Sequence, residues 1–181
     1  MTTGQIFAVV GPSGAGKDSL IAGAMAKRPD LVWARRVITR LPEAAGEPFE
    51  AVTAAQFARR KARGEFILHW QAHDLCYGIP MSICDDLASG RFVIFNGSRA
   101  ALPDAFAKFP NLTVLLVTAS PSVLAQRLSQ RGRESSVDIA RRLSRADFAM
   151  PAGITARVVT NDGSLDQGVA QFLHALQPVR A

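Results

Sequence analysis

The sequence predicts an α/β fold in which helices cover both faces of a parallel sheet, giving three layers. Strand-like and helix-like segments alternate almost throughout the 181 residues, the pattern expected of such folds. The first of these strands and helices flank a glycine-rich turn. Hydrophobic residues make up 48% and charged residues 20%, as in ordinary globular proteins. This length suits one core, so we expect a single domain over residues 1–181.

The elements of the first half follow from apolar runs and helix-capping residues. Residues 5–10 form a β-branched apolar run, typical of a buried parallel strand. Thr53 and Gln56 predict a capping box for a helix that Gly64 ends. Periodicity assigns the remaining segments: a helix over 17–25, strands over 32–38 and 66–70, and a helix over 80–89.

The second half continues the alternation. Residues 112–117 are the clearest later strand, and Ser120 and Pro121 supply the N-cap and first-turn proline of a helix running toward Arg131. The same criteria predict strands over 92–95 and 157–160 and helices over 137–148 and 164–176.

The charge balance favours small phosphorylated ligands. The net charge is +6, with 17 Arg against 4 Lys, and the planar guanidinium fork matches phosphate oxygens. Nucleic-acid binding or a general arginine bias would also give this balance, but no recognised nucleic-acid module occurs in the sequence. Cys76 and Cys84 lack zinc spacing and predict free thiols. The apolar start is too short to span a membrane. We expect a cytoplasmic monomer or homodimer without nucleic-acid or membrane partners.

A phosphate-binding loop follows the first strand. Its sequence matches GxxxxGK over Gly11, Pro12, Ser13, Gly14, Ala15, Gly16 and Lys17. Glycines let successive backbone N–H groups converge on phosphates, and the positive end of the following helix adds to the attraction. We therefore expect these residues to bind ATP, with the Lys17 ammonium acting as a catalytic charge at the β- and γ-phosphates.

One position departs from this motif. Ser or Thr is expected after the lysine, but the chain has Asp18 followed by Ser19. A carboxylate beside a triphosphate is repelled unless a cation lies between them. The hypothesis is that Asp18 and Ser19 hold Mg²⁺, directly or through water. The alternative is that Asp18 only complements the helix N-terminus.

Several further segments occur in an order that resembles the guanylate-kinase-like branch of P-loop kinases over nearly the whole chain. They are GPSGAGK at 11–17, Thr39-Arg40 with Gly46-Glu47, Tyr77-Gly78, the run from Arg127 through Arg131-Gly132-Arg133-Glu134 to Arg142-Leu143, and Asn161-Asp162. The resemblance implies a P-loop fold of the nucleoside monophosphate kinase type, with an acceptor-binding insert at about 36–80 and an arginine-bearing lid at about 127–145.

The same resemblance implies the roles of individual residues. Arg40 and Tyr77 would hold the acceptor phosphate, and Asn161 would lie near the adenine. The lid arginines would act on the transferring group: Arg127, Arg131 and Arg142.

Departures from guanylate kinases concern the acceptor. The two carboxylates that read guanine there are missing, because Leu68 or His69 stands at the first place and residues 95–99 contain no acid. A base-reading site loses on the order of 10⁴ in discrimination without its hydrogen-bond partners. The second arginine of the acceptor-phosphate motif is also absent, and Arg99 is an additional cation.

With these replacements, the sequence is similar to the ribose 1,5-bisphosphate phosphokinase family. The shared segments are GPSGAGKDS at 11–19, RVITR at 36–40, Ala72-His73 with YGIP at 77–80, NGSR at 96–99 and RGRE at 131–134. The resemblance implies transfer of a phosphoryl group from ATP, with Mg²⁺, to ribose 1,5-bisphosphate, giving 5-phosphoribosyl 1-diphosphate. It implies these substrate-binding residues: Arg36, Arg40, His69, Tyr77, Asn96, Ser98 and Arg99.

Two other functions compete with this interpretation. A guanylate kinase or another nucleoside monophosphate kinase would turn over GMP. A non-catalytic guanylate-kinase-like binding module would hold partner proteins and would not bind ATP. The intact Gly16-Lys17 pair and the arginine-bearing lid argue against such a module.

Overall fold

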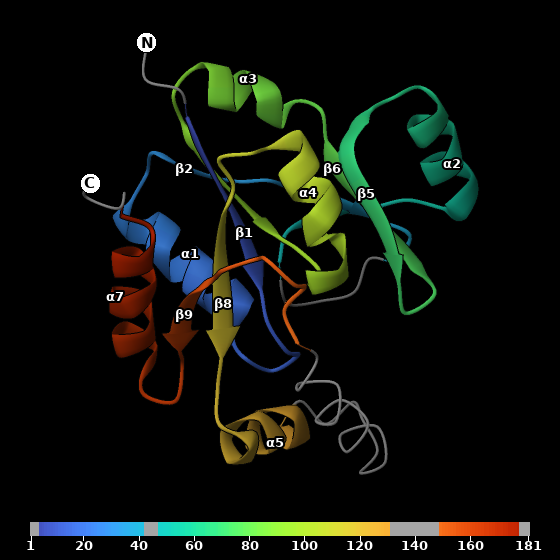
Figure 1. The fold of residues 1–181 in the computed structure, drawn as a ribbon. Coiled ribbons are helices and arrows are strands. Elements are labelled where there is room, and N and C mark those ends of the chain that lie inside the picture. The colour runs from blue at the N-terminus through green and yellow to red at the C-terminus, as the bar shows by residue number, and fades with distance from the viewer. Residues whose placement is uncertain (1–3, 42–46, 131–148, 178–181) are drawn as a thin grey trace.

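A computed structural model describes residues 4–41, 47–130 and 149–177. Its central sheet has five strands in the order β2-β7-β1-β8-β9, all parallel (Figure 1). The predicted parallel sheet is therefore confirmed. The strands are β1 (Gln5–Val10), β2 (Leu31–Trp33), β7 (Phe92–Asn96), β8 (Thr113–Thr118) and β9 (Arg157–Thr160).

Helices cover both faces of this sheet. Phe7 and Val9 of β1 belong to a core shared with α1 (Lys17–Lys27) and α7 (Leu165–Ala175). The alternate β1 residues belong to a second core, shared with α3 (Ile83–Ala88) and α4 (Leu102–Lys108). Because successive side chains of a strand point to opposite faces, the apolar run of β1 is buried on both sides. Figure 1 shows α1 and α7 side by side along one side of β1.

A second sheet stands beside the first, in the order β4-β3-β6-β5. Its β3 and β4 are parallel, whereas β6 pairs antiparallel with both β3 and β5. Helix α2 packs against it through Phe57, which contacts a cluster with Val37 and Phe66. The elements are β3 (Arg36–Ile38), β4 (Phe49–Ala51), α2 (Ala54–Ala62), β5 (Phe66–Ala72) and β6 (Leu75–Pro80).

The single strand predicted over 32–38 is wrong. Trp33 of β2 pairs with Ile94 in the central sheet, whereas Val37 of β3 pairs with Gly78 in the second sheet. The chain leaves the first sheet at Ala34, whose N–H donates to the Ile94 carbonyl at 2.8 Å. The sequence has neither glycine nor proline at this crossing, and only Arg35 and Arg36 interrupt the apolar residues there.

The β5–β6 hairpin was also not predicted, since the residues of β6 look like a loop followed by a helix. His73 and Asp74 form its two-residue turn, with φ of 52° and 61°. Both residues thus adopt the left-handed conformation of a type I′ turn, for which asparagine and glycine are the usual signal. As a result α3 begins at Ile83, three residues later than Pro80.

The predicted capping box at the start of α2 is confirmed. Thr53 Oγ1 accepts from the Gln56 N–H at 3.2 Å, and the Gln56 side chain accepts from the Thr53 N–H at 2.7 Å. Helix α5 (Pro121–Gln130) follows β8 as expected, and a short 3₁₀ turn, η1 (Arg99–Ala101), precedes α4. The helix predicted over 137–148 lies outside the described residues. Within them, no helix combines the length and apolar character that crossing a bilayer requires.

Candidate active site

Buried polar side chains gather beside the glycine-rich loop. Among the described residues, the buried polar or charged side chains are Glu47, Asn96 and Asn161, exposed by 8%, 2% and 4%. A buried polar group is costly unless it is hydrogen-bonded. All three make hydrogen bonds: Asn161 to the loop after β1, and Asn96 to both Glu47 and the first turn of α1. Asn96 Oδ1 is buried without a partner among the described residues.

The loop's shape depends on its glycines. Gly11, Gly14 and Gly16 have φ of 147°, 87° and 88°, a region that residues with a Cβ rarely adopt. A Cβ on Gly11 would lie 2.0 Å from the Val117 carbonyl oxygen of β8. The Lys17 ammonium turns back and donates to the carbonyls of Gly11 and Pro12, both at 2.9 Å. The predicted loop of backbone turns followed by a helix is present.

Asn161 ties the end of β9 to this loop. Its Nδ2 donates to the Ala15 carbonyl at 2.8 Å, and its backbone N–H donates to Thr118 of β8 at 2.8 Å. A Cβ on Gly16 would lie 2.5 Å from the same Nδ2. Asn161 therefore lies at the loop and holds its backbone, and its place near the adenine stays a prediction.

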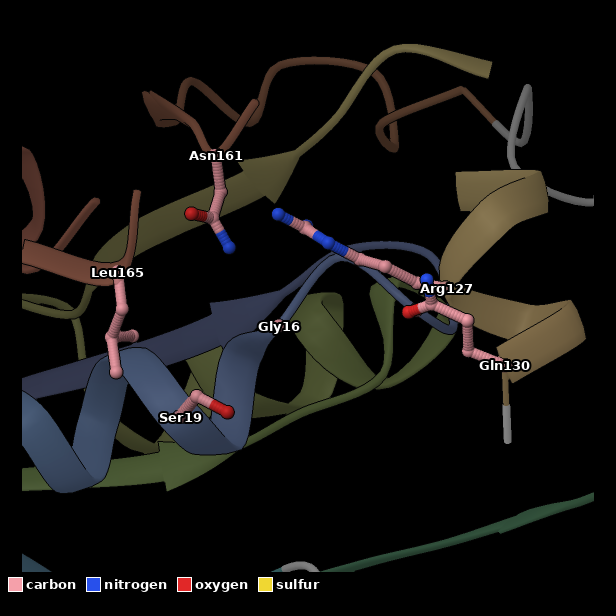
Figure 2. A pocket seen from close by; sticks show the side chains of 7 residues that line it. Gly16, Ser19, Arg127, Gln130, Asn161 and Leu165 are labelled. Atoms are coloured by element: carbon pink, nitrogen blue, oxygen red, sulfur yellow. The ribbon is translucent and has the colours of Figure 1, made fainter. Parts of the chain in front are cut away.

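A cavity of about 400 Å³ opens next to the loop (Figure 2). Figure 2 shows the Arg127 side chain reaching from α5 across Gly16 toward Asn161. Its Nη1 is buried and has no hydrogen-bond partner within the described part of the chain. The lining residues are Gly14, Gly16, Ser19, Arg127, Gln130, Asn161 and Leu165. Arg127 is thus at the phosphate loop, whereas Arg131 and Arg142 lie outside the described residues.

A hydrogen-bonded chain leads from the loop to the second sheet. Asn96, at the end of β7, donates through Nδ2 to Asp18 Oδ1 at 2.7 Å and to Glu47 Oε2 at 2.6 Å. Glu47 in turn accepts from Arg36 Nε at 2.5 Å and from its Nη2. Sequence reasoning gave Glu47 no role, although it belongs to the Gly46-Glu47 pair of the resemblance.

Cations and aromatic rings line the same face of the second sheet. Trp70 and Tyr77 are cross-strand partners whose rings stack at 5.3 Å between centroids. Arg36 Cζ lies 5.1 Å from the Tyr77 centroid, and Arg40 Cζ lies 4.3 Å from that of Phe49. Burial raises the pKa of the Tyr77 phenol, so this group stays a hydrogen-bond donor at neutral pH. This face can bind an anionic ligand, because the Tyr77 hydroxyl can donate a hydrogen bond and guanidinium groups lie beside it.

The structure does not bring His69 into this cluster. His69 neighbours Trp70 on β5, so its side chain points to the opposite face of the sheet. There it lines a separate cavity of about 360 Å³ with Phe57 and Lys61 of α2. Burial lowers the pKa of the His69 imidazole, and the Lys61 charge adds to this.

Ser98 and Arg99 follow β7 directly, two and three positions after Asn96. Both are partly buried. Burial lowers the pKa of the Arg99 guanidinium, and a partly desolvated cation of this kind attracts anions more strongly than an exposed one. The NGSR segment therefore begins at the hydrogen-bonded chain and continues into η1.

Comparison with known proteins gives close relatives over almost the full chain. No protein-family model matches. Ribose 1,5-bisphosphate phosphokinase PhnN of Ruegeria sp. is 44% identical, with 98% of this chain and 94% of that protein covered. The bifunctional ribose 1,5-bisphosphokinase-thymidine phosphorylase of Cupriavidus necator is 50% identical over 97% of this chain. The chain spans 29% of that relative's length.

A solved structure supports the fold. The chain superposes on guanylate kinase from Anaplasma phagocytophilum with a TM-score of 0.67, covering 96% of this chain and 84% of that one, at 17% sequence identity. At this identity the likeness concerns the fold alone. From its identity to the Ruegeria protein over nearly the full length of both, the chain belongs to the ribose 1,5-bisphosphate phosphokinase family.

Proposed function

We propose that the chain transfers the γ-phosphoryl group of ATP to the 1-phosphate of ribose 1,5-bisphosphate, giving 5-phosphoribosyl 1-diphosphate and ADP. The observation that carries the proposal is the pairing of two sites through Asn96. The phosphate loop and its cavity lie on one side, and the guanidinium-bearing face of the second sheet lies on the other. The names of the relatives in the same family supply the sugar.

The reaction needs charge neutralisation and alignment more than it needs a base. An oxygen of the acceptor phosphate, already anionic at neutral pH, attacks the γ-phosphorus. The bond from that phosphorus to the β,γ-bridging oxygen breaks, and ADP takes the electron pair. The transition state of such transfers is loose, so catalysis depends largely on positioning and electrostatic stabilisation.

The loop residues would bind the nucleotide. The loop amides and the Lys17 ammonium would hold the β- and γ-phosphates, after the ammonium leaves the carbonyls of Gly11 and Pro12. Arg127 would interact with the same phosphates, because its buried Nη1 already lies across Gly16. Arg131 and Arg142 would join it from the lid.

The loop also fits Mg²⁺. The ion prefers hard oxygen ligands and is usually held by one or two protein oxygens together with substrate phosphates. Ser19 lines the cavity, and the Asp18 carboxylate stands next to it in the first turn of α1. These two residues would hold Mg²⁺, which when bound neutralises charge on the β- and γ-phosphates.

The second sheet would bind the acceptor. Arg40 and Tyr77 would hold the phosphate that attacks, and Arg36 and Arg99 would hold the rest of the sugar bisphosphate. Guanine fits this face poorly. The buried carboxylate on the described part of it, Glu47, is already engaged by Arg36 and Asn96.

The test is identification of the product. The protein, ATP, Mg²⁺ and ribose 1,5-bisphosphate are incubated, and ³¹P spectra are recorded over time. We expect the 1-phosphate resonance to be replaced by two coupled diphosphate resonances while ADP accumulates and the 5-phosphate resonance persists. Phosphorylation elsewhere on the sugar, or ADP formation without a new diphosphate, would contradict the proposal.

A further inference from the structure

Asn96 lies between two carboxylates that belong to different parts of the molecule. Asp18 comes from the first turn of α1, and Glu47 precedes β4 of the second sheet. Two carboxylates this close to one another repel unless a donor separates them. The Asn96 amide supplies two N–H bonds from one nitrogen, at 2.7 and 2.6 Å. Since its oxygen cannot face a carboxylate, these bonds also fix the direction of the amide.

Glu47 extends this link to a cation of the acceptor face. Its two oxygens receive Nε and Nη2 of Arg36, the bidentate geometry that aligns a guanidinium most strictly. The guanidinium then lies over the Tyr77 ring. Of its hydrogen-bonding edges, the one at Nη1 makes no hydrogen bond to any described residue and remains for a ligand.

We propose that Glu47 and Asn96 are positioning residues. They hold the Arg36 guanidinium toward the acceptor and fix its position relative to the phosphate loop. The proposal rests on the phosphotransferase function above. Neither residue needs to touch the substrate. Asn96 fixes Glu47, Glu47 fixes Arg36, and the strand of the central sheet that carries Asn96 sets the position of all three.

A matched ion pair on the other face of the same sheet provides the control. Glu50 of β4 accepts from Arg60 of α2 at 2.7 Å. Like Glu47, Glu50 pairs with an arginine, but this arginine lies on the helix that covers the opposite face of the sheet. Glu50 is more exposed than Glu47, and Arg60 keeps a second partner in Glu65. Glu50→Gln therefore controls for the loss of a carboxylate from the second sheet without touching the link to the loop.

The kinetic experiment compares Glu47→Gln, Asn96→Ala, Asn96→Asp and Glu50→Gln. We expect Glu47→Gln to raise the acceptor KM about tenfold to a hundredfold, as for the loss of hydrogen bonds to a charged group, with the ATP KM unchanged. Asn96→Asp should be worse than Asn96→Ala, although it preserves shape, because it brings a third carboxylate to the first two. If Asn96 contributed only packing, the isosteric Asn96→Asp would raise the acceptor KM less than Asn96→Ala does. Equal acceptor KM values for Glu47→Gln and Glu50→Gln would overturn the proposal.

A second readout does not depend on the substrate. In ¹⁵N-labelled protein, an arginine Nε–H held by a carboxylate gives a sharp signal that exchanges slowly with water. We expect the Arg36 signal to persist in Glu50→Gln and to broaden in Glu47→Gln and Asn96→Ala. An unchanged signal in Asn96→Ala would overturn the proposal even if the acceptor is ribose 1,5-bisphosphate. If wild-type protein turns over no sugar bisphosphate but the signal behaves as expected, the positioning link stands and the proposed function fails.

Discussion

The carboxamide of Asn161 donates to the carbonyl oxygen of Ala15 at 2.8 Å, which joins the end of β9 to the middle of the phosphate loop. The two residues are far apart in sequence, and both are buried. Through this bond the C-terminal part of the chain takes part in shaping the loop.

Asn161→Ala should weaken ATP binding and destabilise the protein. The Ala15 carbonyl would lose its partner in a buried place, at a cost of about 1–3 kcal/mol in the free energy of unfolding. Urea denaturation and a nucleotide titration measure the two effects. Asn161→Asp should bind ATP more weakly still, because an acceptor would then face the carbonyl. Wild-type affinity in both variants would show that the bond does not shape the loop.

Gly16→Ala should abolish nucleotide binding, whereas Gly64→Ala should not. Both glycines have positive φ, 88° and 70°. A Cβ at Gly16 would also meet Asn161 Nδ2 at 2.5 Å, whereas one at Gly64 meets no atom within 4 Å. Both variants carry the cost of backbone strain, about 1–2 kcal/mol. Comparing them therefore isolates the effect of the steric clash with Asn161, which only Gly16→Ala has. Calorimetric titration with ATP gives the answer, and ATP binding by Gly16→Ala would contradict the described loop geometry.

Thr53→Ala should lower the free energy of unfolding by about 1 kcal/mol. It removes the side-chain acceptor of the capping box at α2. Turnover should be retained, because α2 covers the face of the second sheet opposite Tyr77. Chemical denaturation and steady-state rates measure the two quantities together. A large loss of turnover with unchanged stability would mean that α2 contributes to the acceptor site.

His69→Gln should make the protein less sensitive to acid. The pKa of folded His69 is below its usual value of 6.5, so the unfolded chain binds the proton more tightly. Stability is therefore lost as pH falls below about 6.5, and the variant escapes this loss. Urea midpoints between pH 7.5 and 5 measure the difference.

Burial is the largest cause of the lowered pKa of His69, and Lys61→Met tests the second cause, the nearby charge. The Lys61 charge lowers the pKa of His69, while Asp104 opposes it, so this variant should show a weaker pH dependence than the wild type. His69→Gln should also leave the acceptor KM unchanged, because His69 lies on the face of the second sheet opposite Tyr77. A raised KM would mean that His69 reaches the acceptor, as the family resemblance implies.

Elements with a local signal were predictable from the sequence. The phosphate loop follows from its glycines and lysine, and the two ends of α2 follow from Thr53 and Gly64. The split between β2 and β3 was not predicted, because Arg35 and Arg36 interrupt the apolar residues there without a glycine or proline that would mark a strand end. The turn at His73 and Asp74 lacks the glycine that usually marks it.

The site was predictable in the same partial way. Its charged residues could be taken from motifs, but the bonds between them could not. The bridge from Asp18 to Glu47 joins residues far apart in sequence through Asn96, and Trp70 carries no signal beyond being aromatic. Such contacts are set by the tertiary arrangement of the two sheets.

The most direct measurement is ADP release with ATP and Mg²⁺, comparing ribose 1,5-bisphosphate with GMP at equal concentration. The account predicts turnover of the sugar bisphosphate and none of GMP, because the acceptor face offers guanidinium groups and its buried carboxylate is already paired. Turnover of GMP in preference to the sugar would contradict it, since another group would then have to read guanine.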